Sequence, residues 1–156
     1  MNAQDIAQAC RDAMLLGDRA SAALGMQVLA VGPGTATLQM MVREDILNGH
    51  NICHGGLIST LADSAFAFAC NSRNEATVAS GFDINLLAAA NLSDVLTATA
   101  HEVHKAGRTG VYDVVVDNQH GLRIAAFRGR SYTFKGRAVV EGLPMDSRTS
   151  LPAAAT

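Results

Sequence analysis

The sequence contains no tryptophan, only two tyrosines and five phenylalanines, and few charged residues. Scarce aromatic residues argue against the stacking platforms that bind nucleic-acid bases. The formal net charge of -2 exerts no electrostatic pull on nucleic acid or an anionic membrane. No run approaches the roughly 18 apolar residues of a membrane-spanning helix, and the N-terminus does not resemble a signal peptide. We therefore expect neither nucleic acid nor membrane as a partner.

Cysteine is also scarce. The sequence has three, Cys10, Cys53 and Cys70, and an odd number cannot pair completely into disulfides. We interpret them as reduced thiols of a cytoplasmic protein. His50, Cys53 and His54 raise the possibility of zinc, but two of them are adjacent and no fourth ligand follows nearby, so we expect no metal. The sequence also lacks the Gly-x-Ser-x-Gly elbow of serine hydrolases and the glycine-rich phosphate loops of nucleotide-binding folds.

Hydrophobic residues make up 49% of the 156 residues, which is enough for the core of a single domain. Their spacing predicts a helix over 2–24 with a break near Gly17 and an apolar helix over 57–70. Strands are predicted at 26–32, 35–43, 77–87, 95–103, 111–118 and 122–134.

The short turns between the predicted strands favour an antiparallel sheet. A helix that is apolar on most of its circumference must be wrapped by that sheet, which gives an α+β fold. We expect one domain over 1–141, a flexible tail over 142–156, and an oligomer that covers the remaining sheet faces.

The apolar helix carries one carboxylate, Asp63, and no other charge between Ile52 and Cys70. On a helical wheel of about 100° per residue it shares a narrow stripe with small and polar residues, namely Ser59, Thr60, Ser64 and Ala67. A solvated surface residue is one interpretation. A cleft wall is the other, because no lysine or arginine stands at the neighbouring stripe positions.

The helix begins with His54-Gly55-Gly56. Glycines allow a ligand to approach the backbone closely, and the first amides of a helix have no internal acceptors. Such a helix start binds anions or polarises a carbonyl group, although a tight turn without a ligand has the same composition. Together with Asp63, it suggests that an electrophile is held beside a base or a nucleophile.

The segment NGHNICHGGLISTLADSAFAFACNS, followed by VASGFDINLL, LTATAHEVHKAGRTGVYDVVV and AAFRGRSYTF, resembles the PaaI (phenylacetate-degradation) branch of the hotdog-fold acyl-CoA thioesterases. The resemblance runs from about Leu24 to Lys135. It implies a hotdog fold, with an antiparallel sheet wrapped around a central helix, in a dimer that builds two active sites at its interface and pairs into a tetramer. It also implies hydrolysis of a small acyl-CoA, most simply phenylacetyl-CoA or hydroxyphenylacetyl-CoA, with no cofactor beyond the substrate's own coenzyme A.

The resemblance also implies roles for individual residues. Asp63 matches the catalytic carboxylate, either a nucleophile or a general base, and the Gly55 amide matches the group that polarises the thioester carbonyl. Asn48 matches the residue across the interface that orients the carboxylate or its water. His54 matches the histidine that holds the loop, and Ser80 lies near a serine that helps to place water.

Coenzyme A itself is expected to lie along the C-terminal half of the chain. The turn that contacts its nucleotide end is matched by Gly107, Arg108 and Thr109. From His104 to Arg137 there are seven basic and two acidic residues, which favours an anionic ligand, and we assign Lys105 and Arg128 to the same contact.

One departure concerns the segment LLAAANLSD, where Ala88 and Ala89 replace the Arg-Pro pair of the family and remove a possible contact to the carrier. Two other functions stay open. One is a non-catalytic acyl-CoA-binding module, and the other is a hotdog hydratase or dehydratase that would use His54 with Asp63.

Overall fold

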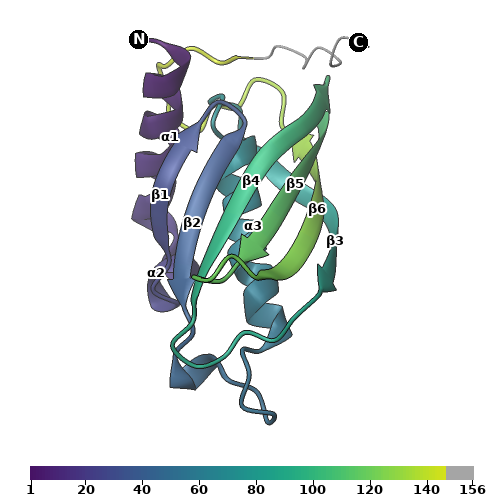
Figure 1. The fold of residues 1–156 in the computed structure, drawn as a ribbon. Coiled ribbons are helices and arrows are strands. Elements are labelled where there is room, and N and C mark those ends of the chain that lie inside the picture. Colours follow the sequence, from purple (N-terminus) through teal and green to yellow (C-terminus); the bar gives the residue numbers. More distant parts are fainter. Residues whose placement is uncertain (147–156) are drawn as a thin grey trace.

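Six strands form one antiparallel sheet in the order β1-β2-β4-β5-β6-β3 in the computed structural model, which describes residues 1–146. The strands are β1 (Gln27–Gly32), β2 (Thr35–Met41), β3 (Thr77–Leu86), β4 (Val95–Ala106), β5 (Thr109–Asp117) and β6 (Arg123–Thr133). Short turns join β1 to β2, β4 to β5 and β5 to β6, so these pairs form hairpins. β3 reaches the far edge of the sheet instead, where it pairs with β6 (Figure 1).

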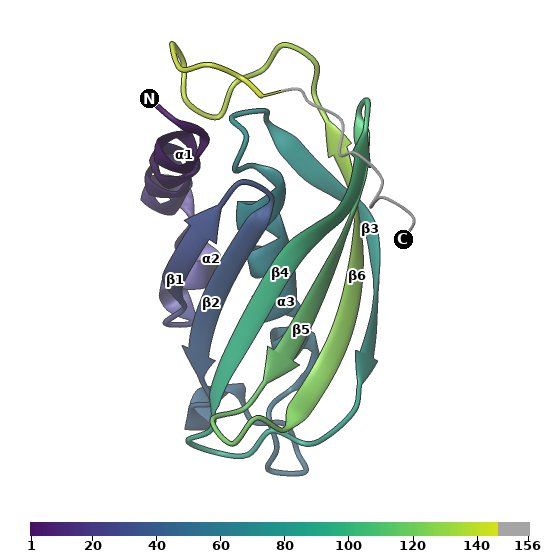
Figure 2. The same cartoon turned by 45° about the horizontal axis from the view of Figure 1, so that its top comes forward.

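The central helix α3 (Gly55–Cys70) lies against one face of this sheet, and α1 (Ala3–Gly17) lies beside β1 (Figures 1 and 2). Phe66 of α3 packs against two aromatic rings of the sheet, with centroid distances of 5.4 Å to Tyr112 and 5.9 Å to Phe127. Gly129 permits this contact, because a Cβ atom there would lie 3.0 Å from the Phe66 ring. Truncating such a buried aromatic side chain costs roughly 3–5 kcal/mol.

The α+β hotdog architecture predicted from the sequence is confirmed, and the strand bounds differ from the predicted ones by a few residues at most. The predicted N-terminal helix is indeed broken near Gly17. A second short helix, α2 (Arg19–Ala23), begins there because the Asp18 carboxylate accepts a hydrogen bond from the Ser21 amide at 3.0 Å. A short 3-10 helix, η1 (Glu44–Ile46), precedes the loop that leads to α3.

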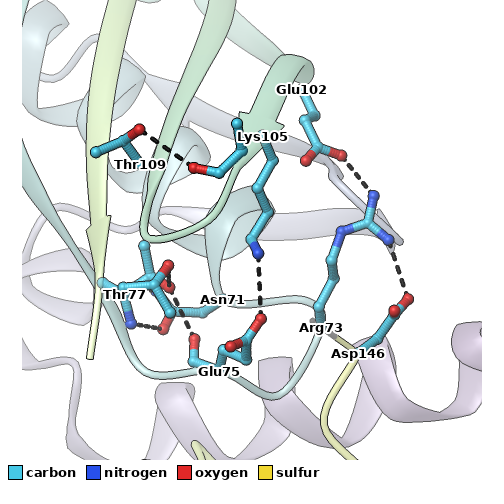
Figure 3. A network of polar contacts seen from close by, with 10 residues as sticks. Asn71, Arg73, Glu75, Thr77, Glu102, Lys105, Thr109 and Asp146 are labelled. Atoms are coloured by element: carbon cyan, nitrogen blue, oxygen red, sulfur yellow. Dashed lines mark hydrogen bonds and ion pairs between the residues drawn. The ribbon is translucent and has the colours of Figure 1, made fainter. Parts of the chain in front are cut away.

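The C-terminal tail predicted from residue 142 is held to the domain as far as Asp146, and the rest of it lies outside the described residues. Asn74 is fully buried and has a positive φ of 63°. Its side-chain amide donates to three carbonyls of residues 140–144, and its Oδ1 accepts from a backbone amide of that segment at 2.7 Å. Arg73 pairs with Asp146 at 3.2 Å (Figure 3). These contacts join residues that are far apart in the sequence, so they could not be predicted from the polar composition of the tail.

Candidate active site

The start of α3 is shaped by His54, which is its N-cap residue. The imidazole Nδ1 accepts a hydrogen bond from the Gly56 amide at 3.0 Å, so the cap satisfies the second amide of the helix rather than that of Gly55. The His54 backbone amide donates to the Ile46 carbonyl at 2.9 Å and ties the preceding loop to η1. His54 thus fixes both the loop and the direction of the first helical amides.

A hollow of about 330 Å³ opens beside this helix start. It is bounded by the loop before α3, the first turn of α3 and the segment after β3, and its lining residues are Asn48, Ile52, Cys53, Gly55, Ile58 and Leu86 to Ala90. The Asn48 side chain accepts hydrogen bonds from the His50 and Ile52 amides, at 2.9 and 3.3 Å, which closes the loop on itself. The structure therefore brings Asn48 and Gly55 to one hollow within one chain.

Asp63 is half-buried on α3 and does not line this hollow. In residues 1–146, no basic side chain pairs with its carboxylate. Burial raises the pKa of Asp63 above its ordinary value of 3.8. A half-buried carboxylate of raised basicity is better suited to accept a proton than a fully solvated one, and perturbed carboxylates of this kind are typical of functional sites.

Gly55 and Asp63 lie eight residues apart on one straight helix. At a rise of 1.5 Å per residue, their backbones are about 12 Å apart along the helix axis. One thioester carbonyl is far too small to contact both groups of the same chain.

Ser80 occupies a β-bulge in β3, between Ala79 and Gly81. Its Oγ donates to the Arg130 carbonyl at 3.2 Å. It lines a second hollow of about 240 Å³, together with His104, Thr109 and Arg130. The structure thus groups Ser80 with the β4–β5 hairpin and not with the helix-start hollow.

The β4–β5 turn presents the residues expected at the nucleotide end of coenzyme A. Gly107 has a positive φ of 58°, which a tight turn requires and glycine adopts without strain. The Thr109 hydroxyl donates to the Ala106 carbonyl at 3.3 Å, and the Arg108 carbonyl accepts from the Thr133 amide at 2.7 Å. The Arg108 side chain is exposed, with a hydrogen bond of 3.4 Å to the Tyr132 hydroxyl.

Lys105 and Arg128, by contrast, have carboxylate partners within the chain. Lys105 is 4% exposed and pairs with Glu75 at 3.2 Å (Figure 3). Arg128 binds Asp113 through two hydrogen bonds of 2.6 and 2.8 Å, which lower the pKa of that carboxyl group. We therefore leave Lys105 and Arg128 out of the carrier site proposed below.

Four of the seven basic side chains between His104 and Arg137 pair with carboxylates. Arg123 pairs with Asp117 at 2.6 Å, and Arg130 pairs with Asp83 of β3 at 2.7 Å. Counting charges from His104 to Arg137 suggested an unpaired positive surface, because that range does not include Asp83 of β3. Within the described residues, Arg108 remains the exposed cation at the carrier turn.

Sequence reasoning did not assign the apolar wall of the first hollow, which Leu86 and Leu87 form at the end of β3. The only signal was the apolar run at the end of the strand predicted over 77–87. Among residues 1–146, no three or more histidine, cysteine, aspartate or glutamate side chains gather where they could hold a metal ion. In the same range, none of the helices has the length and apolar character needed to cross a bilayer.

A curved antiparallel sheet around a central helix, with a glycine-rich helix start beside an apolar hollow, defines the hotdog class of α+β proteins. The thioesterase superfamily matches residues 50–125. The acyl-coenzyme A thioesterase PaaI of Escherichia coli is 44% identical over 124 residues, which cover 80% of this chain and 89% of that protein.

Solved structures agree. The E. coli PaaI protein from the phenylacetic acid degradation operon has a TM-score of 0.85 and 40% identity, over 87% of this chain and 99% of that one. A hypothetical thioesterase protein of Streptococcus pneumoniae, solved with coenzyme A, has a TM-score of 0.74 and 26% identity, over 82% of this chain and 98% of that one. The chain therefore belongs to the thioesterase superfamily, which confirms the family predicted from the sequence.

Proposed function

We propose that the protein hydrolyses a small acyl-CoA thioester, with phenylacetyl-CoA or hydroxyphenylacetyl-CoA as the expected substrate, to the free acid and coenzyme A. The observation that carries this proposal is the helix start at Gly55, which opens on an apolar hollow shared with Asn48. The identity to an acyl-coenzyme A thioesterase supports the choice of carrier.

In this mechanism the Gly55 amide donates a hydrogen bond to the thioester carbonyl oxygen and stabilises the negative charge that develops there. Asp63 either attacks the carbonyl carbon or takes a proton from the water that attacks it. The C–S bond then breaks, coenzyme A leaves as the thiolate, and water supplies the oxygen of the acid. These steps need no metal and no cofactor beyond the substrate's own coenzyme A. Arg108, with Gly107 and Thr109, holds the nucleotide end.

The complete site needs two copies of the chain. Asn48 and Gly55 share one hollow, whereas Asp63 lies about 12 Å further along α3. We therefore assign one site to Asn48 and Gly55 of one copy and Asp63 of the partner subunit. Two such sites form in each dimer, and two dimers form the expected tetramer.

β3 supports this assembly. It is a ten-residue edge strand, and its exposed side chains include Val78 and Phe82, which are 46% and 40% exposed. A long apolar edge strand is a site for pairing with another strand, and a second copy of β3 is the simplest cover.

Complementation between two inactive variants tests the shared site. Asp63→Asn and Asn48→Ala are each expected to be inactive, but a mixed dimer holds one intact site if Asn48 and Asp63 come from different chains. Random mixing should then restore about a quarter of the wild-type activity, because half of the dimers are mixed and each carries one working site. If both residues acted within one chain, mixing would restore nothing.

The hydrolase itself is tested by incubating the purified protein with phenylacetyl-CoA and a thiol reagent. Thiol release with an equal amount of phenylacetate supports the proposal. Tight binding without turnover would indicate a binding module, and absorbance from a new double bond would indicate a dehydratase.

We also place this activity in the cytoplasm. Cys10, Cys53 and Cys70 are buried free thiols, as expected for a protein of a reducing compartment.

A further inference from the structure

Leu86, the last residue of β3, lies directly against the first residue of α3. A Cβ atom placed on Gly55 would be 2.5 Å from Leu86 Cδ1, so the leucine methyl group packs on the Gly55 backbone. Leu86 is nevertheless 52% exposed and lines the helix-start hollow. Its side chain therefore lies beside the residue whose amide is proposed to hold the thioester carbonyl.

The backbone around Leu86 is fixed, which leaves its side chain as the adjustable part of the wall. The amides of Leu87 and Ala88 both donate to the Ile124 carbonyl, at 2.8 and 3.3 Å. The Ala90 carbonyl accepts from the Cys53 amide at 2.8 Å, which closes the other end of the segment. Rotation of Leu86 changes the depth of the hollow without moving these strands.

The lining also limits the chemistry of the ligand. The residues that line the hollow are aliphatic apart from Asn48, Cys53 and Gly55, and none is charged. Its volume of about 330 Å³ lies at the lower end of the roughly 300–1,000 Å³ of small-molecule sites. A free carboxylate on the acyl group, as in succinyl-CoA, would lose its hydration without gaining a cationic partner, which is costly.

We propose that Leu86 sets the size limit of the acyl group, and that the hollow takes short or aromatic acyl groups without charge. This assignment rests on the proposed function, because it places the thioester carbonyl at the Gly55 amide. Removal of the Leu86 side chain lengthens the hollow at the point where the acyl chain begins. A longer chain then fits with its carbonyl still at the helix start.

The test compares kcat/KM for phenylacetyl-CoA, decanoyl-CoA and succinyl-CoA in wild type and two variants. Leu86→Ala should raise the ratio of decanoyl-CoA to phenylacetyl-CoA about tenfold, since a single methylene in a pocket already changes discrimination by roughly that factor. Leu29→Ala is the matched control, because Leu29 is 51% exposed but lies on β1, at the opposite edge of the sheet. It should leave the ratio unchanged, and wild type should discriminate against succinyl-CoA about 100-fold.

A second variant covers the case in which Leu86→Ala does not fold. Leu86→Phe keeps the site apolar but narrows it, and should lower kcat/KM for phenylacetyl-CoA about tenfold relative to acetyl-CoA. A profile of either folded variant that stays within twofold of wild type would overturn the role of Leu86, although wild-type hydrolysis would leave the proposed function standing. Efficient hydrolysis of succinyl-CoA would overturn the restriction to uncharged groups. Failure of wild type to release thiol from every acyl-CoA would overturn the proposed function itself.

Discussion

Replacing Asp63 with asparagine is the most direct test of the proposed chemistry. The substitution keeps the shape of the side chain and removes its charge and basicity. If Asp63 is a general base, kcat should fall 10²- to 10⁴-fold, and a nucleophile should lose at least as much. That range corresponds to about 2.7–5.5 kcal/mol of transition-state stabilisation. KM should change little, because the carboxylate acts mainly in the transition state.

The same variant should be at least as stable as wild type at neutral pH. Burial raises the pKa of folded Asp63 above 3.8, and no basic side chain among residues 1–146 compensates its charge. Folding therefore favours the protonated form, so this stabilisation is present at low pH and is lost as the pH rises through the folded pKa. The asparagine side chain does not ionise, so the variant avoids this loss of stability at neutral pH. Its higher stability relative to wild type should vanish below about pH 3.8, where Asp63 is protonated in both the folded and the unfolded state.

Both quantities can be measured on the same preparations, by thiol release and by thermal denaturation at acidic and neutral pH. The acid limb of the wild-type kcat/KM profile should have a midpoint above 3.8 and should be absent in the variant. Asp12→Asn, on the exposed side of α1, is a matched control that should change neither activity nor pH profile. An Asp63→Asn protein that keeps more than about a tenth of wild-type kcat would refute the catalytic role.

Two further variants probe the carrier turn and the C-terminal segment. Arg108→Ala should raise KM for acyl-CoA several-fold and leave kcat within about twofold, because a phosphate contact far from the carbonyl contributes uniform binding; unchanged KM would remove this turn from the site. Asn74→Ala should lower the free energy of unfolding in urea by about 2–4 kcal/mol, since it removes the hydrogen bonds of a fully buried side chain to the C-terminal segment and leaves alanine at a positive φ. A loss below about 0.5 kcal/mol would show that this segment is held by other contacts.

The fold was predictable because its signals are local. Alternating apolar residues mark strands, and short turns between them force antiparallel neighbours. The buried positions of α3, such as Leu61 and Phe66, cover too much of its circumference for a surface helix. These patterns determined the wrapped arrangement before any tertiary contact was known.

The ion pairs were not predictable, because they depend on cross-strand register. Asp113 stands opposite Arg128 only because β5 and β6 pair in one register. Lys105 faces the core only because a bulge between Glu102 and His104 shifts the alternation along β4. Without that bulge, the same lysine would point to the outer face, where an anionic carrier could reach it.

The motif from Asn48 to Asp63 shows a further limit of sequence reasoning. Its members are close in sequence, so they were expected to form one site, yet helix geometry separates the Gly55 amide from the Asp63 carboxylate. The loop before α3 folds back and brings Asn48 to Gly55, while each residue of α3 carries the chain a further 1.5 Å away. A contiguous motif can therefore supply both halves of an active site without forming it within one chain, and in the proposed dimer the partner subunit supplies the missing carboxylate.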